Sequence, residues 1–309
     1  MPTSECLAAS LARLEDDRVS SRSKGWVYAG SILFLTTGLA LYCLRVAGAP
    51  MAALGCEVIG MILSAIIVGA ISNRLKRAFK REVIPVLLAN IDPSLAFHMD
   101  GYIDERTFNA AELYQYPNRY SGKDLVEGRI GDTAVRFSFV NAEEQYQQTT
   151  TDSDGHSKTE TRYRTIFNGL FFVADFNKHF TGRTLVRPRS SNFFSKFFGS
   201  HIALEDPDFE KRFSVTSTDQ VSARYILTPS LMERLKHLHD TVGTFNASFC
   251  DSRLFLAIKM PPDSFEPSVR RSFLENDQIE RILDNLRTIT SIVGELGLNV
   301  RIWSKPPSP

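Results

Sequence analysis

The stretch WVYAGSILFLTTGLALYCL (residues 26–44) decides the fold of this chain, because it contains no charged residue. A second apolar run, residues 51–72, follows after the short connector RVAGAP (residues 45–50). A helix that crosses the hydrocarbon core of a membrane needs about 20 apolar residues, and both runs approach that length. The sequence therefore predicts a transmembrane helical hairpin, with the lipid bilayer as a partner.

Basic residues around the hairpin predict its orientation. The connector carries only Arg45, whereas cations lie on both outer flanks. By the positive-inside rule, both termini are expected in the cytoplasm. A basic flank beside a membrane also attracts anionic lipid head groups, although setting topology is its ordinary role. The cations that follow the second run are Arg74, Lys76, Arg77, Lys80 and Arg81.

Two features of the second run bear on packing. Its single charge, Glu57, is expected near the outer membrane boundary, and the alternative is a proton or ion relay. Cys56, Gly60 and Ser64 recur at helical spacing and form a face of small residues. Such a face lets helices approach closely, so it predicts packing against the first span, another protomer or another membrane protein.

Composition bounds the rest of the chain. The whole chain is nearly neutral, at +1, but its charges are unevenly distributed. From Glu82 onward there are 26 Lys and Arg against 30 Asp and Glu, which argues against nucleic acid as a partner. The four cysteines form no CxxC pair and indicate a reduced compartment without structural disulfides.

The predicted organisation has five parts in order along the chain. These are an amphipathic cytoplasmic segment (1–24), the hairpin (25–73), a basic juxtamembrane linker helix (74–93), a cytoplasmic α+β domain (94–304) and a Pro-rich tail (305–309).

Strand and helix signals occur in blocks within the large domain. Gly131-Asp132 and Asp251-Ser252 are expected to be hairpin turns, and the polar residues 147–160 a loop or hairpin tip. Thr228-Pro229 predicts a helix start, and apolar residues at a 3.6 period predict a helix over residues 275–296. Blocks of this kind favour an α+β fold with a mostly antiparallel sheet.

Several long strings support a family resemblance. The strings YSGKDLVEGRIGDT, GLFFVADFNKHFTGRTLV, LEDPDFEKRFSVTSTDQVSARYILTPSLMERL and LNVRIW resemble a bacterial membrane-protein family known only as domain-of-unknown-function family 3137. The resemblance covers nearly the whole chain and implies two N-terminal spans followed by a cytoplasmic domain at the bacterial inner membrane. It assigns no catalytic residue.

One polar cluster invites a functional reading. Asp175, Asn177, Lys178 and His179 directly follow the apolar run GLFFVA, where a strand end would present them. An acid, an amide and two cations are able to bind a polar ligand or act as acid and base. The same residues also suit an ordinary strand-to-turn transition, which the nearby Gly182 would close.

Recognised motifs for cofactors and metals are missing from the sequence. There is no HExxH, Walker, GxGxxG or GxSxG motif and no Cys/His cluster. The string DSDGHSKTE lacks the ligand spacing of a calcium loop. We therefore expect neither a metal nor another cofactor.

These observations favour a membrane-tethered interaction or scaffold module without enzymatic activity. One alternative is an enzyme of unknown type with its site near Asp175 to His179. The other is a lipid-sensing protein that uses the basic flank and the aromatic side chains of Phe193, Phe194, Phe197 and Phe198.

Overall fold

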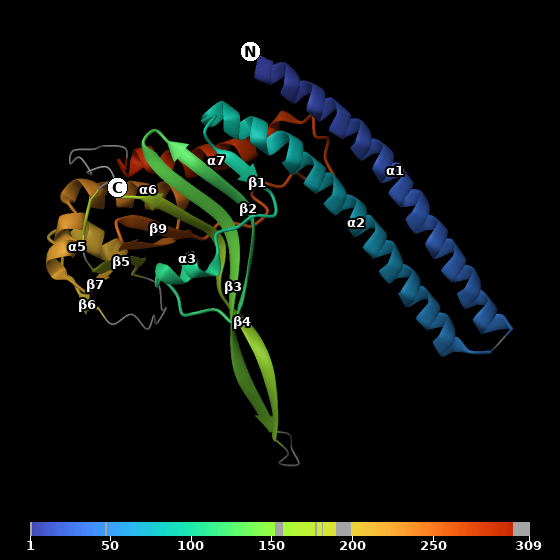
Figure 1. The fold of residues 1–309 in the computed structure, drawn as a ribbon. Coiled ribbons are helices and arrows are strands. Elements are labelled where there is room, and N and C mark those ends of the chain that lie inside the picture. The colour runs from blue at the N-terminus through green and yellow to red at the C-terminus, as the bar shows by residue number, and fades with distance from the viewer. Residues whose placement is uncertain are drawn as a thin grey trace. The chain divides into compact units, whose positions relative to one another are not determined.

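The fold is known from a computed structural model that describes residues 2–46, 48–151, 157–176, 178–180, 182–189 and 199–298. The chain divides into two compact units (Figure 1). The first comprises Met1–Leu87 with Phe265–Leu283, and the second comprises Leu88–Ser264 with Asp284–Pro309. Asn177 and the four phenylalanines between 193 and 198 lie outside the described residues.

Two long helices dominate the first unit. α1 (Pro2–Arg45) joins the predicted amphipathic segment and the first apolar run in one helix. α2 (Pro50–Ile91) continues through Pro85 and ends before Asp92-Pro93, as that dipeptide predicts. Both helices are long and apolar enough to cross a membrane, and only 11% of the most apolar window of each is buried.

Small residues set the register between α1 and α2. A Cβ at Gly60 would lie 2.2 Å from the Thr36 hydroxyl oxygen, so no side chain fits there. The Ser64 hydroxyl donates to the Ala29 carbonyl at 3.3 Å. A Cβ at Gly25 would lie 3.0 Å from Ile71. Gly60 and Ser64 of the predicted small-residue face therefore pack against the first apolar run.

The second unit is built on one antiparallel sheet, in the order β1-β2-β3-β4-β9-β8-β5-β7-β6 among the described residues. This arrangement confirms the α+β prediction. The strands are β1 (Ala96–His98), β2 (Arg119–Ile130), β3 (Thr133–Thr151), β4 (Ser157–Asp175), β5 (Arg183–Pro188), β6 (Ser200–His201), β7 (Phe213–Ser217), β8 (Phe245–Cys250) and β9 (Arg253–Ile258).

Turn chemistry fixes the register of two predicted hairpins. Ile130 pairs with Thr133 across Gly131-Asp132, and Cys250 pairs with Arg253 across Asp251-Ser252. Asp251 and Ser252 both adopt positive φ, as a tight two-residue connection requires. Both hairpin predictions are confirmed.

Local signals also place the helices. The Thr228 side chain accepts from the Leu231 amide and begins α6, as predicted. The predicted late helix is confirmed with nearly the expected limits. The helices outside the hairpin are α3 (Glu105–Ala110), α4 (Pro207–Arg212), α5 (Gln220–Ile226), α6 (Pro229–Val242) and α7 (Asn276–Glu295).

The polar stretch 147–160 differs from its prediction over most of its length. β3 and β4 remain paired as far as Thr151 and Ser157, so only residues 152–156 are left for the tip, and these lie outside the described residues. An apolar alternation is the sequence signal of a half-buried strand, and this stretch has none because both of its faces are exposed.

Candidate functional site

The carboxylate of the predicted polar cluster lies on the sheet. Asp175 ends β4 and pairs with Arg253 of β9. It lines an open depression of about 550 Å³ together with Glu127, Arg136 and Arg253. Acidic and basic side chains alternate there, so the depression has no dominant charge with which to select a ligand.

Lys178 and His179 of the cluster contact residues other than Asp175. The Lys178 ammonium donates to the Tyr225 carbonyl at 2.7 Å, lies 4.6 Å from the centre of the Tyr225 ring, and has its pKa lowered by burial. His179 Nδ1 lies 3.3 Å from the Ser252 hydroxyl. His179 and Tyr225 line a second open depression, also of about 550 Å³. Asp175 and His179 thus line different depressions.

A row of polar side chains lies on strands β5 and β8 and was not predicted from the sequence. The Arg183 guanidinium forms an ion pair with Glu112 and contacts the Cys250 sulfur at 3.1 Å. Burial raises the pKa of the Cys250 thiol, which is therefore protonated rather than nucleophilic at neutral pH. Burial also lowers the pKa of Arg187, whose Nε and one terminal nitrogen are buried without a hydrogen-bond partner.

A two-stranded arm extends from the sheet (Figure 1). β2 accompanies β3 only as far as Glu143, and β9 accompanies β4 only from Leu170 onward. Residues 144–151 and 157–164 therefore pair only with each other. The arm reaches about 27 Å at the usual strand rise. Its side chains from Gln145 to Thr150 are all exposed.

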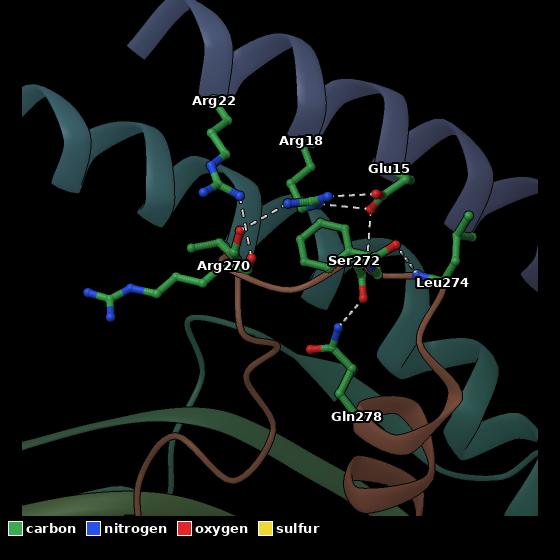
Figure 2. Close-up of polar contacts among 9 residues, drawn as sticks. Glu15, Arg18, Arg22, Arg270, Ser272, Leu274 and Gln278 are labelled. Atoms are coloured by element: carbon green, nitrogen blue, oxygen red, sulfur yellow. Dashed lines mark hydrogen bonds and ion pairs between the residues drawn. The ribbon is translucent and has the colours of Figure 1, made fainter. Parts of the chain in front are cut away.

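In the first unit, residues 265–278 bind the N-terminal half of α1 and the C-terminal half of α2. We call these residues the docking segment. The Glu15 carboxylate of α1 accepts from Arg18 at 2.7 and 2.9 Å and from the backbone N–H of Phe273 at 2.9 Å (Figure 2). These donors lower the pKa of Glu15 to about 2, with the Arg18 hydrogen bond as the largest cause. Glu15 is therefore a fixed anion that holds the segment.

The docking segment also binds α2 through charge and aromatic packing. Glu266 forms ion pairs with Lys76 and Lys80, each at 3.0 Å. The Lys80 side chain is only 6% exposed. Phe79 and Phe273 are fully buried, with their ring centroids 5.4 Å apart. The predicted basic flank therefore divides into two buried or half-buried cations that bind Glu266 and three exposed ones, Arg74, Arg77 and Arg81.

The described part of the chain has no group of three or more His, Cys, Asp or Glu side chains that could hold a metal ion. Sequence reasoning missed the docking segment because its partners lie about 250 positions earlier, as in the contact of Arg18 with the Val269 carbonyl. The only local signal is a mixture of three acids and two arginines in a short polar segment.

Comparison with known proteins gives one family match over part of the chain and one distant structural similarity. A family model described as "Protein of unknown function (DUF3137)" matches residues 165–298. No curated protein matches the chain. Among solved structures, the crystal structure of the mycobacterial trehalose monomycolate transport factor A, TtfA, is 10% identical with a TM-score of 0.35, covering 72% of this chain and 93% of that chain. We draw no conclusion from so distant a similarity.

Proposed function

We propose that this chain, which carries a domain of the DUF3137 family of unknown function, is a membrane-tethered interaction or scaffold module without enzymatic activity. In this proposal α1 and α2 cross the bacterial inner membrane, both termini are cytoplasmic, and the sheet domain binds a protein partner in the cytoplasm. The β3–β4 arm is the observation that carries the proposal.

The arm has the properties of a partner-binding element. A two-stranded ribbon is marginally stable alone in water, and this one contacts the rest of the domain at its base, where Gln145 binds Asn118 and Arg119 covers the Tyr163 ring. Its outer edges leave backbone N–H and C=O groups free to pair with another strand. Thr, Gln and charged side chains cover it, which keeps it soluble and suits a polar protein surface. Binding would supply the order that the arm alone lacks.

The proposed membrane tether is supported by the exposed apolar side chains of the first unit. Phe34 is 80% exposed and Met51 is 81% exposed, although both lie in the long apolar runs. Exposed apolar side chains all along two helices are expected where lipid covers them. Gly60 and Ser64 already pack on α1, which leaves the arm as the better candidate for binding a partner.

Site-specific photo-crosslinking tests the arm. p-Benzoylphenylalanine is placed at Gln147 or Thr161, both exposed on the arm, and at Val221, which is 78% exposed outside it. We expect the arm positions, but not Val221, to give a cross-linked product of one defined mass in native membranes. The same product should persist when Asp175 and Lys178 are changed to alanine.

An excision variant is the matched control. Gln145 and Tyr163 are register partners, so residues 146–162 are replaced by Asn-Gly to close a two-residue hairpin. We expect unchanged membrane yield and thermal stability with loss of the partner. Arm positions that give no product, or an excised chain that keeps its partner, would contradict the proposal. A partner lost with Asp175 and Lys178 instead would favour the enzyme alternative.

A further inference from the structure

We propose that the docking segment reaches the lipid head groups and that Arg270 binds anionic phospholipid there, together with Arg22 and Arg74. The proposal rests on the membrane crossing of α1 and α2 proposed above. It adds a binding site that lies more than 180 residues beyond both spans in the sequence.

The register of the helix pair defines where the membrane begins. Gly25 packs against Ile71, so the start of the first apolar run and the end of the second lie at one level. Trp26, 68% exposed, marks this level as an interfacial aromatic residue. Arg22 and Arg74 each lie about one helical turn outside it, or about 5–6 Å. The head-group layer on each side of a bilayer is about 5–8 Å thick. Both arginines therefore fall within that layer.

Backbone contacts bring Arg270 to the same level. The Arg22 guanidinium donates to the Arg270 carbonyl at 3.5 Å, and the Arg18 guanidinium donates to the Val269 carbonyl at 3.5 Å (Figure 2). The buried Phe273 ring fixes the next turn of the segment against α2. Arg270 is thus held at the level of Arg22 by its main chain, while its side chain is not used for docking.

Arg270 differs from the neighbouring cations in its ion pairing. Arg18 binds Glu15, Lys80 binds Glu266, and Arg271 binds Asp277 at 3.0 Å. The Arg270 side chain is exposed, extends away from the Glu15 cluster in Figure 2, and makes no ion pair with the described residues. An exposed guanidinium at head-group level that has no acid beside it attracts phosphate, with about a fivefold gain in local anionic lipid per cation.

Trp26 supplies a probe at the right level. The chain has two tryptophans, so a Trp303→Phe background leaves Trp26 as the only one. The full-length protein is placed in vesicles that contain brominated phosphatidylglycerol or brominated phosphatidylcholine, and quenching of Trp26 is compared. We expect stronger quenching by the anionic lipid. Arg270→Gln should lower that preference by about twofold to fivefold, whereas Arg270→Lys should keep most of it.

The control removes a cation far from the head groups. Arg13 is 66% exposed and lies about 20 Å along α1 from Trp26, so Arg13→Gln should leave the preference unchanged. Equal quenching by both lipids, or an Arg270→Gln variant that behaves like the parent, would overturn the lipid site. A Trp26 that neither lipid quenches would overturn the proposed membrane crossing itself, which separates the two failures.

Discussion

Replacing Glu15 by glutamine should release the docking segment from α1. The substitution keeps the size of the side chain and one acceptor oxygen but removes the negative charge. The carboxylate has three hydrogen bonds, two from Arg18 and one from the Phe273 amide. The glutamine amide nitrogen cannot accept any of them.

The size of the effect follows from burial. The side chains of Arg18 and Glu15 are 9% and 15% exposed, so the guanidinium would be left nearly buried without a counter-charge. A hydrogen bond to a charged group contributes about 1.5–3 kcal/mol, and breaking a fully buried pair costs about 3–5 kcal/mol. Residual solvent screening lowers the second figure. We expect a loss of about 2–3 kcal/mol in the free energy of local opening.

Hydrogen exchange measures that opening. A change of about 2–3 kcal/mol lowers the protection of the amides in residues 265–275 by about 30- to 160-fold. Full-length protein in nanodiscs is the sample, followed by peptide mass spectrometry. Asp16→Asn is the matched control, because Asp16 is exposed and adjacent but makes no docking contact. Protection of residues 265–275 that survives Glu15→Gln would refute the reasoning.

Two further predictions concern the first unit. The pKa of Glu15 falls from 4.5 to about 2 on folding, so its stabilisation is complete above pH 4.5 and declines as the pH falls toward 2. Exchange protection of residues 265–275, corrected for intrinsic rates, should follow this window, and Glu15→Gln should abolish the dependence. Gly60→Ala should separate α1 from α2 at Thr36 and cost about 1–3 kcal/mol. A lowered unfolding temperature in mild detergent checks this, with Gly55→Ala as the control in open space; equal temperatures would contradict it.

Much of the fold could be predicted because its signals are local. A Gly-Asp turn, a Thr-Pro helix start and a 3.6-residue apolar period each act within a few residues, and each is confirmed. The prediction of a transmembrane helical hairpin rested on residue type alone, because a membrane span requires a long apolar run.

The docking segment could not be predicted because its structure is imposed from elsewhere. From Phe265 to Glu275 its backbone is neither helix nor strand, and its Phe273 amide and Val269 carbonyl bind residues of α1 instead. The strands of the arm were not predicted for a related reason. Without a buried face, Gln147 and its neighbours carry no alternation, and their strand is fixed by pairing with β4. In the Asp175 cluster, nearness in sequence does not bring side chains together. Asp175 and His179 line different depressions.

The charges of the described residues also bear on the choice between scaffold and enzyme. A general acid or base needs a pKa near the working pH and access to a substrate. Glu15 is held ionised well below that range, and Lys80 is closed off against Glu266. Burial raises the pKa values of the Tyr114 and Tyr120 hydroxyls and of the Cys250 thiol, so these groups stay protonated at neutral pH. Because their protonation states do not change near neutral pH or they are closed off from solvent, these groups stabilise the fold and do not exchange protons with a substrate. The proposed binding roles of the arm and of Arg270 use none of these groups.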